Sequence, residues 1–133
     1  MAYYLGTTVD LPFDDAIART REALKAEGFG VITEIDIKDT LKNKIGVDFR
    51  RYTILGACNP GLAYEALQLE DKVGTMLPCN VVVQETGPGR TEVAAIDPVV
   101  SMQAIENPRL HAAAETVRGK LQRAVDSLAL ARP

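Results

Sequence analysis

An apolar stripe near the C-terminus constrains the fold of this chain more than any other feature of its sequence. The stripe recurs at close to the helical period over about five turns. Its members are Leu110, Ala114, Val117, Leu121, Val125 and Leu128. Asn107 and Pro108 come just before it, and they are typical N-cap and first-turn residues. The pattern predicts a long helix with one buried face, which requires an apolar layer from the rest of the chain to cover it.

Glycines and prolines divide the rest of the sequence into short segments. Alternating apolar and polar residues predict strands over 3–9, 31–37 and 51–57, the second of them half-buried. Residues 79–85 and 91–96 read as a hairpin joined by a turn at 87–90. Helical patterns separate the first strands: one begins at Pro12 and closes at Gly28, and a shorter one ends at Gly46. A third begins at Asn59–Pro60.

The resulting order is β-α-β-(α)-β-α-β-β-α. It predicts an α+β fold in which a mostly antiparallel sheet carries helices packed on one face. The 133 residues fit a single domain, 1–133. Several strands carry small or apolar residues on both faces, including Ile32, Leu55, Ala57 and Val82. A partner that covers the second face would explain this, so we expect a homodimer.

Charge and hydropathy exclude several classes of function. Eighteen acidic residues against fifteen basic ones give a net charge of −3, which argues against nucleic-acid binding because that requires a basic face. The longest apolar run, 54–58, is far shorter than the roughly 20 residues of a membrane-spanning helix. The first basic residue is Arg19, so the N-terminus does not resemble a signal peptide. We therefore expect a cytoplasmic protein with reduced cysteines and no membrane partner.

The two cysteines lie at predicted element boundaries. Cys58 ends a strand directly before the Asn59–Pro60 helix start, and Cys79 begins the next strand. A thiolate at Cys58 would be stabilised by the positive end of the helix dipole. If the two strands are neighbours, the thiols lie close together and could serve a redox function. The alternative is that each cysteine is a small buried apolar residue.

Other catalytic and cofactor patterns are weak. His111 is the one histidine, and with Cys58 and Cys79 it makes only a three-ligand zinc candidate that lacks the usual ligand spacing. No G-x-S-x-G motif or phosphate-binding glycine loop is present. The free N–H groups at Asn59–Pro60 could bind an anion, although an ordinary helix cap has the same sequence. We predict no cofactor, and the sequence favours a protein that is not an enzyme.

Several short stretches together resemble a bacterial and archaeal family, the domain of unknown function 302. They are 12–16, 28–31, 34–36, 38–46, 55–60, 77–83 and 96–98, and the resemblance extends over nearly the whole chain, 3–128. The resemblance implies an α+β fold and a homodimer, and it brings no activity, substrate or cofactor. The motif positions that match are Cys58, Asn59, Pro60, Pro78, Cys79, Asp97 and Pro98. They fall at predicted strand ends and helix starts, where a small pocket would form.

Three functional hypotheses follow. The first is a homodimer that binds a small molecule in an apolar pocket between sheet and helices, with Cys58, Asn59, Pro60, Cys79 and Asp97 as candidate ligand-binding residues. The second is a protein-interaction module that uses an exposed apolar surface. The third is a thiol-dependent redox or metal-binding protein that uses Cys58 and Cys79.

Overall fold

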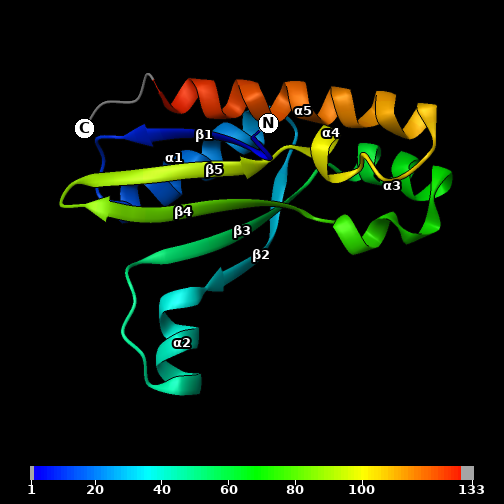
Figure 1. Cartoon of the computed structure of the whole chain (residues 1–133). Coiled ribbons are helices and arrows are strands. Elements are labelled where there is room, and N and C mark those ends of the chain that lie inside the picture. The colour runs from blue at the N-terminus through cyan, green and yellow to red at the C-terminus, as the bar shows by residue number, and fades with distance from the viewer. Residues whose placement is uncertain (1, 130–133) are drawn as a thin grey trace.

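The computed structural model describes residues 2–129, which form a five-stranded antiparallel sheet with helices packed on one face (Figure 1). The strands are β1 (Tyr4–Val9), β2 (Gly30–Asp36), β3 (Tyr52–Cys58), β4 (Cys79–Gly87) and β5 (Arg90–Ile96). The helices are α1 (Phe13–Ala26), α2 (Ile37–Ile45), α3 (Pro60–Leu69), the 3-10 helix η1 (Asp71–Met76), α4 (Pro98–Ser101) and α5 (Pro108–Leu128). The predicted α+β class is confirmed.

The strands lie in the order β1-β5-β4-β3-β2, and every neighbouring pair is antiparallel. The predicted hairpin is the β4–β5 pair, and Gly89 in its turn adopts the left-handed conformation with φ of +69°. β1 pairs with β5 rather than with β2, its neighbour in sequence, so β1 forms one edge of the sheet and β2 the other.

The main core lies between the sheet and the two longest helices, α1 and α5. Leu55, Val83 and Ala95 from the strands and Leu121 from α5 are completely buried there. The predicted C-terminal stripe therefore faces this layer for much of its length, as the sequence pattern requires.

Local signals in the sequence set most helix ends. Gly28, after α1, and Gly46, after α2, have φ values of +88° and +67°, which residues other than glycine rarely adopt. At α3 and α5, the side-chain oxygens of Asn59 and Asn107 accept backbone N–H groups of the first turn.

A second, smaller core lies beyond one end of the sheet, where α3, η1, α4 and α5 meet. Its buried members are Ala66, Val73, Met102, Leu110 and Ala114. The sequence reading did not predict η1 or α4. Both are short, and neither is long enough to show a helical period of its own.

The expected half-burial of residues 31–37 is wrong. β2 lies at the edge of the sheet, and Ile32 and Ile35 are 62% and 46% exposed. A shift in pairing between Val31 and Thr33 also interrupts the strict alternation, and Ile37 already belongs to α2. No residue of α2 is buried, and Figure 1 shows this helix projecting away from α1 and α5. We call residues 36–51 the arm.

Candidate functional site

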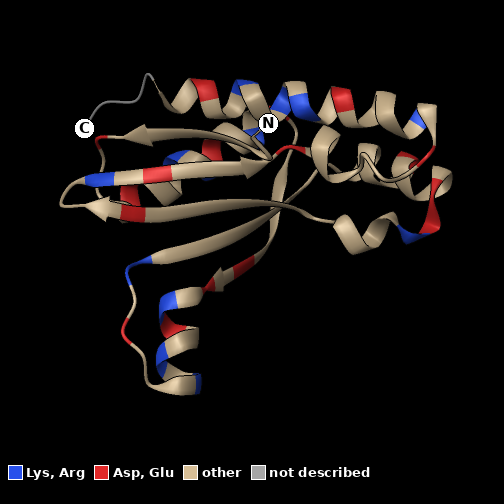
Figure 2. Cartoon of the chain, in the orientation of Figure 1, with Lys and Arg blue, Asp and Glu red and all other residues tan. Residues whose placement is uncertain are grey.

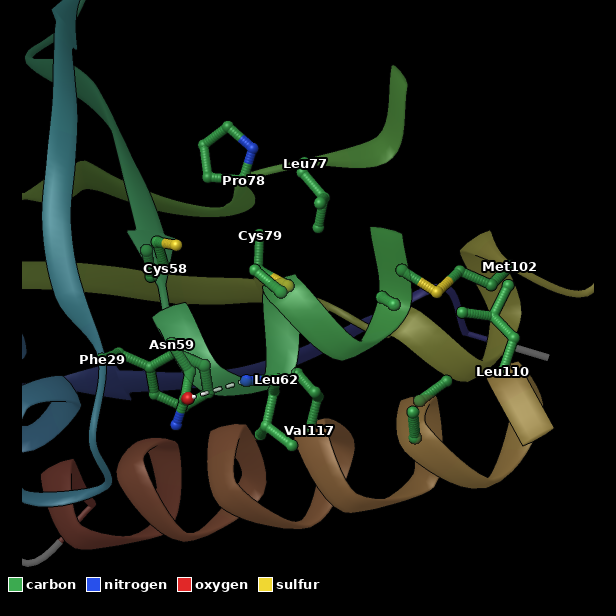
Figure 3. Close-up of a pocket in the computed structure, with 15 residues that line it drawn as sticks. Phe29, Cys58, Asn59, Leu62, Leu77, Pro78, Cys79, Met102, Leu110 and Val117 are labelled. Carbon is green, nitrogen blue, oxygen red and sulfur yellow. Dashed lines mark hydrogen bonds between the residues drawn. The ribbon is translucent and has the colours of Figure 1, made fainter. Parts of the chain in front are cut away.

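An apolar pocket lies at the seam between the two cores (Figure 3). Its cavity volume is about 40 Å³. The lining comes from the end of β3, the start of β4, α3 and α5, together with residues beside them: Phe29, Ala57, Cys58, Asn59, Leu62, Ala63, Ala66, Leu77, Pro78, Cys79, Met102, Leu110, Ala113, Ala114 and Val117. Three of the five predicted ligand-binding residues, Cys58, Asn59 and Cys79, thus meet at one pocket.

Strand pairing brings the two thiols to this pocket. Ala57 lies opposite Cys79 in the β3–β4 ladder, so Cys58 is the next residue along the strand beside it. Cys58 is half-buried and Cys79 is buried, and both are free cysteines. Burial raises the pKa of the Cys79 thiol from its ordinary value of 9.0 to about 11, and the nearby Cys58 adds to the shift. Cys79 is therefore a neutral thiol at physiological pH.

Asn59 contributes the amide of the pocket. Its Oδ1 accepts the backbone N–H of Leu62 at 3.2 Å, which fixes the first turn of α3 against the end of β3. On the other side, the amide nitrogen of Asn59 lies 3.0 Å from where a Cβ on Gly28 would stand. Pro60, the next residue, begins α3 on the exposed surface and does not line the pocket.

Asp97 lies outside the pocket, although it is buried. Its Oδ1 accepts the backbone N–H of Val99 at 3.0 Å and caps α4, while its Oδ2 accepts Nε–H of Arg118 on α5 at 3.0 Å. Both carboxylate oxygens are thus engaged within the chain. Asp97 therefore links α4 to α5.

The three candidate zinc ligands, Cys58, Cys79 and His111, do not come together in the structure. His111 lies in the first turn of α5, where its ring nitrogen Nε2 is hydrogen-bonded to the backbone carbonyl of Ile105, and it is absent from the pocket lining. Across residues 2–129, no three His, Cys, Asp or Glu side chains group closely enough to hold a metal ion.

Several pocket residues were not predicted as site residues. Leu110, Ala114 and Val117 belong to the C-terminal stripe, which the sequence marks only as a buried helix face. Phe29 follows the glycine at the end of α1, and Met102 follows α4. An apolar side chain that lines a pocket has the same sequence signal as one that fills a core, so no pattern separates the two.

The family model described as "Domain of unknown function DUF302" matches residues 5–128. The chain belongs to the DUF302 family. A solved DUF302 structure, the crystal structure of an uncharacterised conserved protein from Bacillus stearothermophilus, is 29% identical to this chain. It superposes with a TM-score of 0.88 over 96% of this chain and 99% of that one. No curated protein matches.

No helix within residues 2–129 is long and apolar enough to cross a membrane.

Proposed function

We propose that this DUF302 chain binds a small apolar molecule in the pocket between β3, α3 and α5, and that it does so as a cytoplasmic homodimer without a catalytic step. One observation carries the proposal: an apolar pocket persists where two cores meet, with one amide and two thiols among its fifteen lining residues. Protein interiors normally close such gaps, because unfilled space loses packing contacts.

The size of the pocket limits the ligand. A cavity of about 40 Å³ has room for only about three water molecules. The ligand is therefore a compact apolar group, such as a short alkyl chain or a small ring, that enters as α3 shifts outward. α3 suits a movable wall, because its main contacts are with α5 and η1 rather than with the sheet.

The polar groups near the pocket favour binding over catalysis. Nucleophilic attack needs a thiolate, and burial keeps the Cys79 thiol protonated at neutral pH. Asn59 is occupied as a helix cap, and Asp97 is occupied by Val99 and Arg118. Asn59 can orient a ligand, and Asp97 holds α4 against α5 outside the pocket, which supports binding without reaction.

The homodimer is supported by the sheet face opposite α1 and α5. Tyr4, at the open end of β1, is 43% exposed, and Ile32 and Ile35 on the edge strand are also exposed. Between these two edges, Tyr3, Tyr52 and Val82 line one hollow together with Tyr4, and apolar surface of this kind marks an interaction site in soluble proteins.

Xenon provides a test of the pocket, since it enters apolar cavities without needing a specific contact. Protein labelled with ¹³C at the methionine methyl groups is exposed to xenon and followed by NMR. We expect the Met102 methyl signal to shift and that of Met76, which does not line the pocket, to stay in place. Native mass spectrometry of the purified protein then reports any ligand that remains bound.

A matched pair of variants makes the result specific. Ala63→Phe adds a ring to the lining, whereas Glu65→Phe adds the same ring to the exposed side of α3. The xenon shift at Met102 should be lost in the first variant and kept in the second. An unshifted Met102 signal in the wild type, with no bound mass, would refute the ligand-binding proposal.

A further inference from the structure

The helix of the arm, α2, carries an apolar stripe, but none of its residues is buried. Ile37, Leu41 and Ile45 recur every four residues, so they lie on one side of α2, and Ile45 is 67% exposed. Isolated helices shorter than about 12 residues are marginal in water. A nine-residue helix with no buried residue therefore needs a packing surface beyond those that its own chain supplies.

A matching surface lies on the helix-free face of the sheet, which we call the open face. It forms a shallow trough of about 350 Å³. Tyr3, Tyr4 and Tyr52 line it, together with apolar residues of β4 and β5 such as Val82 and Ala94. Tyrosine rings give large contact areas for little loss of conformational freedom, and they are enriched in protein interfaces.

The arm and the open face are parts of one continuous surface. Phe49 in the arm packs on Tyr52 of the trough, with the ring centroids 6.1 Å apart. Figure 1 shows α2 projecting beyond the β2–β3 edge of the sheet, so each copy presents an arm next to its open face. A two-fold axis can pair two such copies, because the arm of each then packs on the open face of the other.

Charge supports the same pairing. The arm carries five basic and three acidic residues, so it is positive by two, while the whole chain has a net charge of −3 and the remainder therefore −5. By helical spacing Lys38 and Lys44 flank the apolar stripe of α2, and Figure 2 shows basic residues along this helix. Glu92 is the one charged residue in the trough lining. An arm that enters the trough of another copy brings ammonium groups toward this carboxylate.

We infer that the arm is the dimerisation element: α2 of each copy packs its Ile37–Leu41–Ile45 stripe across the open face of the other copy. The inference rests on the homodimer of the proposed function and names its two contacting surfaces. Each copy contributes both surfaces, so the dimer contains two equivalent arm-to-face contacts and buries the groups that the single chain leaves exposed.

Charge substitutions on the two surfaces test this arrangement in the full chain. Leu41→Glu places a carboxylate in the stripe of the arm, and Val82→Lys places an ammonium group on the open face. Asn43→Glu is the matched control, because position 43 lies on the opposite side of α2 from the stripe. The dimer dissociation constant of each variant is measured by sedimentation velocity, and circular dichroism checks that each variant is folded.

We expect Leu41→Glu and Val82→Lys each to weaken the dimer at least about a hundredfold, because each buries an unpaired charge. Asn43→Glu should stay within about threefold of the wild type. Mixing Leu41→Glu with Val82→Lys should restore a dimer. The mixed pair keeps one unaltered arm-to-face contact and matches Glu with Lys at the other, which arm-to-arm or face-to-face contacts cannot do.

The outcomes separate the two proposals. Even weak contacts form at about millimolar concentration. If the wild-type protein is still monomeric there, both the homodimer and this inference are overturned. A dimer that survives Leu41→Glu, or is not restored by mixing the two folded variants, would overturn the arm-to-face contact alone. The xenon experiment on the pocket is independent of either result.

Discussion

Gly56 is the position where one added methyl group should have the largest effect for its size. It lies in β3, next to Ala57 and close to the pocket. A Cβ there would overlap Oγ1 of Thr33 on β2 and stand 2.6 Å from Cγ of Pro78, which lines the pocket. Threonine has a stiff χ1 torsion and the proline ring cannot rotate, so neither neighbour moves away easily.

The expected cost of Gly56→Ala follows from this crowding. Overpacking a filled site typically costs about 1–3 kcal/mol, and two rigid neighbours place this variant toward the upper end of that range. Alanine would otherwise favour the folded state slightly, since it restricts the unfolded chain more than glycine does. Urea unfolding followed by circular dichroism measures the change as a lower midpoint at an unchanged slope.

Two further variants separate crowding from other effects of the substitution. Gly30→Ala is the control in the neighbouring strand, because a Cβ at Gly30 meets nothing within 4 Å; we expect it to change stability by less than about 0.5 kcal/mol. Thr33→Ala removes one of the two overlaps, so Gly56→Ala should cost less in that background. If Gly56→Ala is as stable as the wild type, or if Thr33→Ala gives no relief, the packing argument fails.

Three other changes test single contacts. Asn59→Ala removes the cap of α3 and should lower the free energy of unfolding by about 1 kcal/mol in urea unfolding. Asp97→Ala leaves a backbone N–H and a guanidinium without their buried acceptor and should cost about 1–3 kcal/mol, whereas Asp71→Ala, at an exposed ion pair, should cost less than about 0.5 kcal/mol by the same assay. The Cys79 thiol has a raised pKa in the native state, so its stabilising effect is complete below pH 9 and is lost toward about pH 11. The stability difference between the wild type and Cys79→Ala should therefore shrink over that interval in urea titrations at fixed pH, and a constant difference would contradict the assigned burial.

The sequence predicted some residues of the candidate site correctly and misplaced Asp97, and the difference between them has a physical cause. Cys58 and Asn59 are neighbours in sequence, and Cys79 joins them because β4 pairs with β3, a pairing that the sequence left open. Asp97 looked equivalent, since it too precedes a proline at an element boundary. Its carboxylate is instead held by Arg118, 21 residues away on α5, and no local pattern reveals a partner at that distance.

Strand β2 shows the same limit for burial. Alternation in β2 correctly predicts an extended strand, because side chains of a strand point to opposite faces in turn. It does not tell whether anything covers those faces. Ile35 was predicted on the buried face of the strand, but β2 lies at the edge of the sheet, where Val31 packs on the main core and Ile35 stays exposed.

The sequence by itself determined the strands, the four longer helices α1, α2, α3 and α5, and most of their ends. Caps such as Asn59 and Asn107 and left-handed glycines such as Gly28 act on backbone groups only a few residues away, so their effect can be read locally. Tertiary structure alone decided the strand order, the pocket at the seam of two cores and the exposure of the arm. Each of these depends on which distant segments meet, and that is set by packing across the whole chain rather than by any one segment.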